Sequence, residues 1–168
     1  MYAFKLIQLI ETRSEHLSEG LMHTLKKGGR CSELLRRVPS DELRRRSHEI
    51  YRDLIDWLLY KTESSLEERY VGLGMKRFKQ GVPYPDLLWA VSTTKEYLWE
   101  FMLAEGLFAE PIDLFGEMDL LHSVDRFFNQ ILYFAAMGYE KARQPESEHE
   151  TRRRALAHTG ERGVAIDR

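Results

Sequence analysis

The sequence predicts an all-α protein, a globular bundle of about five or six helices. Three observations support this class. Apolar residues recur three and four positions apart along most of the chain, which is the spacing of one helix face. Glycines and prolines separate these stretches where helices usually stop and start. The Leu and Ile pairs also follow helical spacing, so no segment alternates as a strand would.

Length and composition indicate one ordinary domain in a reducing compartment. The 168 residues, 43% hydrophobic and 31% charged, are typical of a globular chain rather than a disordered one. A net charge of −2 gives no reason to expect nucleic acid or a membrane as partner. Cys31 is the only cysteine, which excludes an internal disulfide and a multi-cysteine metal site. The apolar start MYAFKLIQLI fits neither a signal peptide nor a membrane span, so we expect a cytoplasmic protein.

The first part of the chain predicts two helices. An apolar row runs to about Lys27, where Gly28 and Gly29 stop the first helix. The next helix begins near Pro39 and Ser40, because Ser40 can cap it and acids follow in its first turn.

A third helix begins at Ser64 or Ser65, which can form a capping pattern with the acids that follow. Gly72 and Gly74 lie inside it, and each costs about 1 kcal/mol relative to alanine. We interpret both glycines as allowing the close approach of a crossing helix. A phosphate-binding loop is a weak alternative, since no strand precedes this segment.

The stretch 81–107 predicts a sharp corner followed by a new helix. Gly81 follows a basic run, as expected at a helix end, and Pro83 prevents that helix from continuing. Pro85 suits the first turn of the next helix, and Gly106 ends it. We expect its apolar row in the core: Leu87, Val91, Leu98, Phe101 and Met102, widened by Leu88 and Trp99.

The last helix opens after Pro111 and Asp113 and is the longest. Its apolar arc is wider than one neighbouring helix requires. We therefore expect one side to face its own domain and another to face a second subunit of a homodimer. The candidate dimer interface is Leu121, Val124, Phe128, Ile131 and Ala135.

A polar row on the same helix contains His122, Asp125 and Asn129. Flanking apolar rows would leave these residues partly buried, as a cluster that contacts a ligand or responds to pH. The favoured alternative is a satisfied polar network at a helix or subunit interface.

The helical domain is assigned to residues 1–143, and residues 144–168 to a charged tail. The opening of this segment can extend the last helix past Pro145, and we expect its end to be disordered.

Catalytic motifs are missing, so we expect a protein that is not an enzyme and carries no metal or cofactor. Haem is the more serious alternative for an all-helical chain of this size. His48 and His122 are the only histidines in strong helical patterns, and the segment 103–115, where a globin would supply its proximal ligand, contains no histidine.

The run 81–88 (GVPYPDLL), preceded by Gly74 and Arg77 and followed by Glu96, Leu98 and Trp99, resembles the middle of the amino-terminal domains of RsbR-type co-antagonist proteins. The last helix is similar to the segment through which such domains dimerise. The resemblance spans about residues 34–143. It implies a bacterial sensory domain in stress-response signalling, with a globin-like fold that has lost its haem. It also implies a homodimer that binds an unknown protein partner and sends its signal along the last helix.

Two other functions stay open beside this one. The first is a haem-binding or small-molecule-binding globin-like protein with a pocket lined by Trp57, Trp89, Trp99 or Phe128. The second is the ligand-binding domain of a transcription regulator, which the missing helix-turn-helix disfavours.

Overall fold

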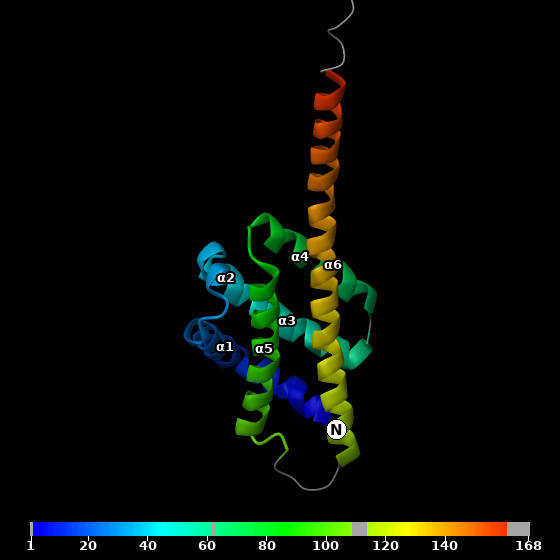
Figure 1. The fold of residues 1–168 in the computed structure, drawn as a ribbon. Coiled ribbons are helices and arrows are strands. Elements are labelled where there is room, and N and C mark those ends of the chain that lie inside the picture. The colour runs from blue at the N-terminus through cyan, green and yellow to red at the C-terminus, as the bar shows by residue number, and fades with distance from the viewer. Residues whose placement is uncertain (1, 62, 109–113, 161–168) are drawn as a thin grey trace, which may run out of the picture.

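The computed structural model describes residues 2–61, 63–108 and 114–160, including their side chains except at 114 and 145–160. In these ranges the chain forms α-helices and no β-strand, which confirms the predicted all-α class (Figure 1). The helices are α1 (Tyr2–Gly28), α2 (Ser32–Arg37), α3 (Ser40–Tyr60), α4 (Glu63–Lys79), α5 (Tyr84–Ala104) and α6 (Leu114–Gly160).

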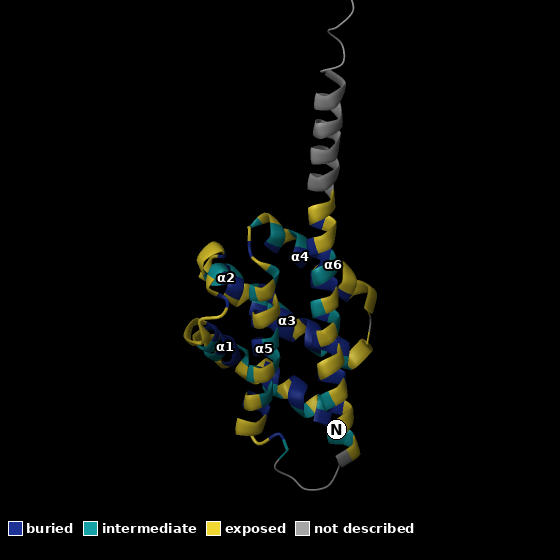
Figure 2. Cartoon of the chain, in the orientation of Figure 1, coloured by how far each residue is buried: buried dark blue, intermediate teal, exposed yellow. Residues whose placement is uncertain are grey.

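The arrangement is a bundle built around α6. Helix α4 makes the most extensive contact with α6, while α1 packs on both α3 and α5. Helix α3 crosses behind α5 and α6, and the C-terminal part of α6 extends beyond the other helices (Figure 1). Buried positions gather where the helices face one another (Figure 2). None of the helices in the described part of the chain is long and apolar enough to span a membrane.

The predicted helix ends are confirmed where glycine takes a positive φ. Gly29 follows α1 with φ 66° and Gly81 follows α4 with φ 73°. The amide of Gly81 bonds the Phe78 carbonyl at 2.9 Å, and the amide of Val82 bonds the Arg77 carbonyl at 3.0 Å. These two bonds close a Schellman motif, which satisfies carbonyls at the end of α4.

Two local predictions about helix starts were wrong. Helix α2 lies between the two helices that the sequence predicted for this part of the chain, where no helix was expected. Ser40 is already the first helical residue of α3, its predecessor Pro39 holds the cap position, and no side chain caps that end. Ser40 is not the cap because the helix already includes it, and the change from extended to helical backbone occurs one residue earlier, at Pro39 (φ −56°, ψ 142°).

The apolar row of α5 is confirmed in the core, since its five predicted positions are all buried. The predicted widening is only partly correct. Trp99 is half-buried, whereas Leu88 is 39% exposed and its neighbour Trp89 is 36% exposed. The buried side of α5 is therefore narrower than the sequence suggested.

Helix α6 crosses the domain boundary that the sequence placed after Arg143, and the expected extension past Pro145 is present. It continues past Pro145 to Gly160, and residues 161–168 of the predicted tail lie outside the described part of the chain. Residues 109–113, which hold the predicted start signals Pro111 and Asp113, also lie outside the described residues.

Candidate functional site

The predicted dimer seam lies inside the single chain. Val124, Phe128, Ile131 and Ala135 are at most 1% exposed, and Leu121 is half-buried. Because these side chains fill the core against the other helices, they cannot form a subunit interface in the folded chain. The assignment to an interface is therefore wrong for the four buried residues: their three-and-four spacing marks the intramolecular seam of α6.

Two glycines set the distance between α4 and α6. A Cβ atom added at Gly74 would lie 2.1 Å from the carbonyl oxygen of Ala135, and one at Gly138 would lie 2.2 Å from that of Val71. The backbones are thus in direct contact at this crossing, which confirms the interpretation of Gly74. The same interpretation was wrong for Gly72, where an added Cβ would meet nothing within 4 Å.

The corner between α4 and α5 is hydrogen-bonded to α6 on either side of that crossing, at Leu132 and at Tyr139. The hydroxyl of Tyr139 donates to the carbonyl of Val82 at 3.0 Å, and that of Tyr84 donates to the carbonyl of Leu132 at 3.2 Å. The rings of Tyr84 and Tyr139 lie edge to face, with centroids 5.1 Å apart, and Phe78 meets Tyr139 in the same way at 5.9 Å. Burial raises the pKa of the Tyr139 hydroxyl to about 12, so this group stays a donor at physiological pH.

A buried arginine fixes the same corner to α3. The Arg77 side chain is 1% exposed and is ion-paired with Glu42. It also donates to the Gln80 side-chain oxygen at 2.6 Å. Burial opposes the charge of Glu42, but the hydrogen bonds and charges of Arg77 and Lys76 outweigh it and lower the pKa of Glu42 to about 2. The corner is thus linked to α3 by the ion pair of Arg77 with Glu42, and to α6 by the hydrogen bonds of two tyrosine hydroxyls.

Asp86, in the first turn of α5, caps the start of α2. One carboxylate oxygen of Asp86 accepts the amides of Glu33 and Leu34, at 2.9 and 3.1 Å. These are amides that the start of a helix leaves without an intrahelical partner. A residue more than fifty positions later therefore caps α2, so the local sequence could not reveal the cap.

The predicted polar cluster is exposed rather than partly buried. His122, Asp125 and Asn129 all lie on the outer face of α6. Asp125 accepts hydrogen bonds from Lys95 of α5 at 2.7 Å and from Asn129 at 3.0 Å. The bond from Lys95 is the main cause that lowers the pKa of Asp125. The flanking rows pack inward on α3, α4 and α5, which turns this row toward solvent.

The three cluster residues border a shallow depression between the start of α4 and α6, together with Glu63, Glu67 and other side chains of α6. Such an open, charged surface suits contact with another macromolecule better than enclosure of a small ligand.

The aromatic pocket of the haem or small-molecule alternative is not formed by the residues that we named. Trp57 is 3% exposed and its indole N–H bonds the Ser123 carbonyl at 3.1 Å, while Phe128 is packed in the core. Trp89 lies at the surface under the Arg30 guanidinium, and Trp99 stacks on Phe108. These tryptophans fill or cover the core, so the pocket prediction was wrong.

A different cavity, of about 50 Å³, lies among α1 to α5. Sites for ligands of drug size occupy about 300–1,000 Å³, so this cavity is far too small for haem. Neither His48 nor His122 lines it: His48 lies 3.7 Å from the Glu15 carboxylate, and His122 is on the outer face of α6. Among the described residues, no group of His, Cys, Asp or Glu side chains is placed to hold a metal ion.

Comparison of the sequence with models of known protein families identifies the family of this chain. A family model described as the RsbT co-antagonist protein rsbRD N-terminal domain matches residues 28–154. The match takes in α2 to α5 and most of α6, including the corner and the α4–α6 crossing, and it leaves out nearly all of α1. Searches of the curated proteins and of the solved structures gave no match to this chain. With well over half of its length matched, the chain belongs to the RsbT co-antagonist rsbRD N-terminal domain family, a family of signal-transduction regulatory domains.

Proposed function

We propose that this chain is a cytoplasmic regulatory module of bacterial stress signalling that catalyses no reaction. In this proposal it forms a homodimer, binds a protein partner and transmits its signal along α6. The observation that carries the proposal is the double role of α6. Its first half supplies buried core residues (Figure 2). Its C-terminal part extends beyond the body of the domain (Figure 1).

The contacts that α6 makes just before it leaves the body support signal transmission along this helix. Tyr139 binds the corner, and Gly138 brings the backbone of α6 against that of α4. Ala142 is the last side chain of α6 that is buried within the described residues, and Arg143 and Gln144 are exposed. Because packed helices cannot deform continuously, repacking in the body would shift or rotate the emerging helix as a unit.

In the proposed homodimer, the second copy would contact a row of α6 residues other than the candidate dimer interface predicted from the sequence. The outer face carries exposed residues three and four positions apart: Phe115, Met118, His122, Asp125, Asn129 and Tyr133. Three of these are large apolar or aromatic side chains, exposed by 84% at Phe115, 57% at Met118 and 62% at Tyr133. Exposed apolar groups along one helix, with polar residues between them, fit an isologous helix-to-helix contact.

The test is the mass of the full chain in solution. Sedimentation equilibrium at micromolar concentration should give twice the chain mass of 19.8 kDa. Tyr133→Glu should shift the equilibrium to monomer, because it places a charge in the contact. Tyr60→Glu is the matched control, since Tyr60 is similarly exposed, by 71%, but ends α3. A monomeric wild type would refute dimerisation, and equal effects of the two substitutions would refute the assigned face.

Partner binding and transmission are tested at the exit of α6. Two glycines inserted after Gln144 should interrupt the helix outside the body and leave the thermal unfolding midpoint of the domain unchanged. In a cell that carries the chain's own signalling pathway, this insertion should abolish the regulatory effect of the chain. An insertion of the same residues in the loop between α1 and α2, at Gly29, should preserve it. Normal regulation by the α6 insertion would refute transmission along this helix.

A further inference from the structure

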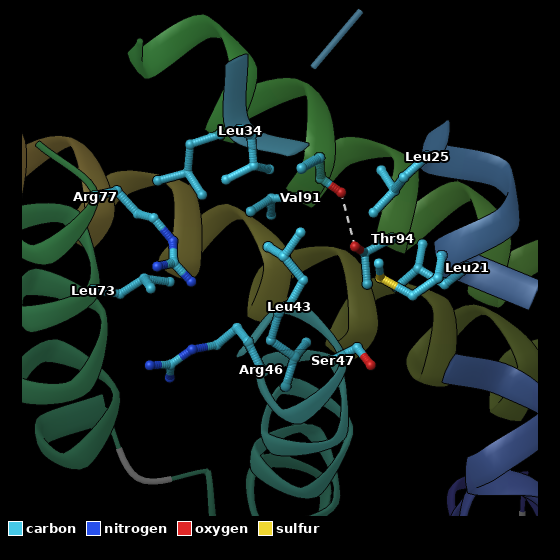
Figure 3. Close-up of a pocket in the computed structure, with 14 residues that line it drawn as sticks. Leu21, Leu25, Leu34, Leu43, Arg46, Ser47, Leu73, Arg77, Val91 and Thr94 are labelled. Carbon is cyan, nitrogen blue, oxygen red and sulfur yellow. Dashed lines mark hydrogen bonds between the residues drawn. The ribbon is translucent and has the colours of Figure 1, made fainter. Parts of the chain in front are cut away.

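The small cavity among α1 to α5 has an apolar wall built by all five helices. The side chains that surround it leave about 50 Å³ unfilled. Figure 3 shows Leu21, Leu34, Leu43, Leu73 and Val91 converging on this space from α1, α2, α3, α4 and α5. Well-packed interiors contain few voids larger than a water molecule, so this space, which is partly open rather than fully enclosed, is a distinct feature of the core.

We propose that this cavity is a binding site for a small neutral apolar molecule, about the size of xenon or dioxygen. An engineered apolar cavity of about 150 Å³ stays dry and binds benzene or xenon. The present cavity is smaller, and it still exceeds the roughly 10–15 Å³ that a single water requires. A ligand of very few heavy atoms therefore fits, and an aromatic ring does not.

The polar atoms of the wall do not favour water. The hydroxyl of Thr94 donates to the Ala90 carbonyl at 2.8 Å (Figure 3). That of Ser47 lies 2.8 Å from the Ser18 hydroxyl and 2.8 Å from the Arg44 carbonyl. A buried water needs two to four polar partners. With both hydroxyl hydrogens used inside the chain, Thr94 and Ser47 offer a water acceptor sites only, which favours an apolar occupant.

Two arginines at one side of the cavity could suggest an anionic ligand, but both already have carboxylate partners. Arg77 is ion-paired with Glu42 and donates to Gln80, and Arg46 lies 2.8 Å from the Glu49 carboxylate. An anion would have to displace one of these partners in a largely apolar setting, which costs desolvation without a free cation in return. The wall therefore selects for a neutral molecule.

Helix α1 closes this cavity on one side with Leu21, Met22 and Leu25. The family match starts at residue 28, the last residue of α1, so the three α1 side chains of the wall lie outside the matched segment. The α1 backbone leaves helical geometry at Arg13 (φ −124°, ψ 17°), so it bends before it reaches the cavity. Binding here would act on all five helices that line the cavity. Such a site would serve as the input of the regulatory module, and this role rests on the proposed function, whereas the binding itself does not.

The test uses methyl NMR spectra of the full chain under increasing xenon pressure. The expected result is a saturable shift of the methyl signals of Leu21, Leu43 and Val91, with the methyl signals of α6 unchanged. Val91→Ile adds one methylene to the wall and should abolish the saturable shift. Val91→Ala enlarges the cavity and should saturate at lower pressure. Val71→Ile is the matched control on the far side of α4 and should behave as the wild type.

Absence of a saturable shift in the folded wild type would overturn the site, as would an unchanged response in Val91→Ile. Sodium formate, an anion of three heavy atoms, provides the test of charge: shifts of the wall methyls with formate and none with xenon would overturn the neutral class. A folded spectrum with dispersed methyl signals is the criterion for each variant, and Val91→Ala keeps the test decisive if Val91→Ile does not fold. The dimer mass is measured separately, so xenon binding and the proposed function can fail independently.

Discussion

Gly138→Ala should destabilise the protein strongly, although alanine is the better helix former. The added Cβ would lie 2.2 Å from the Val71 carbonyl oxygen, 2.8 Å from the Met75 amide nitrogen and 2.9 Å from the Gly74 Cα. All three neighbours are backbone atoms of α4, so no side-chain rotation can relieve the contact. The two helices must move apart instead.

The size of the effect follows from that displacement. Restoring an ordinary contact of 3.4 Å from 2.2 Å requires the backbones to separate by about 1.2 Å, the difference between the two distances. Overpacking of a tight core costs about 1–3 kcal/mol and occasionally more. The higher helix propensity of alanine returns at most about 1 kcal/mol. Because α4 and α6 pack along much of their length, we take the upper end of this cost, and the net loss in the free energy of unfolding is then about 2 kcal/mol.

The assay is urea unfolding followed by far-UV circular dichroism, with the slope against urea compared between variants. Gly72→Ala is the matched control. Gly72 lies on the same helix as Gly74, but its added Cβ would meet nothing within 4 Å. It should therefore stabilise the protein by about 0.5–1 kcal/mol through helix propensity alone. Gly138→Ala and Gly72→Ala are thus expected to change the free energy of unfolding in opposite directions.

If Gly138→Ala unfolds at the wild-type urea concentration or above it, direct backbone contact between α4 and α6 is refuted. If both variants lose stability equally, the effect does not come from the crossing. Either result would also remove the physical basis for coupling the body of the domain to α6 through this contact.

Four further outcomes are expected. Tyr139→Phe should lower the free energy of unfolding by about 1–2 kcal/mol in urea titrations, because the buried Val82 carbonyl loses its donor. Asp86→Ala should speed hydrogen exchange at the first amides of α2 by mass spectrometry, and unchanged exchange would contradict the cap. The pKa of Glu42 is lowered from 4.5 to about 2, so its ion pairs stabilise the fold above pH 4.5 and are lost as pH falls toward 2. In acid titrations Glu42→Gln should flatten the loss of stability in that window, and a curve identical to the wild type would count against the pairing. Asp125→Asn should change the free energy of unfolding of the monomer by less than about 0.5 kcal/mol in urea titrations, since the cluster is exposed on the single chain.

The candidate site shows where local patterns were sufficient and where they were not. The Gly81 corner was predicted because a basic last turn, glycine and two prolines each act within a few residues. The Tyr139 bond to that corner joins residues 57 positions apart. Tyr139 did stand at the edge of the apolar arc of α6, and an aromatic hydroxyl near a core face was the available signal. Its partner could be found only from the packing.

The misassigned dimer seam has a related cause. Spacing predicts which residues of α6 share a face, and it does so correctly for Val124, Phe128, Ile131 and Ala135. It does not tell whether another helix of the same chain or a second chain covers that face. Once α3, α4 and α5 are packed, the apolar row is used inside the domain, and the polar row at His122 turns outward.

The sequence by itself determined the helical class, the main breaks between helices, the buried row of α5 and the resemblance to a regulatory family. Each of these depends on short-range periodicity, on the backbone preferences of glycine and proline, or on a contiguous motif. Only the tertiary structure decided that Asp86 caps α2, that Gly74 and Gly138 meet, and that a small cavity lies beneath α1. These features depend on distances between segments far apart in the chain, which arise only when the helices pack together.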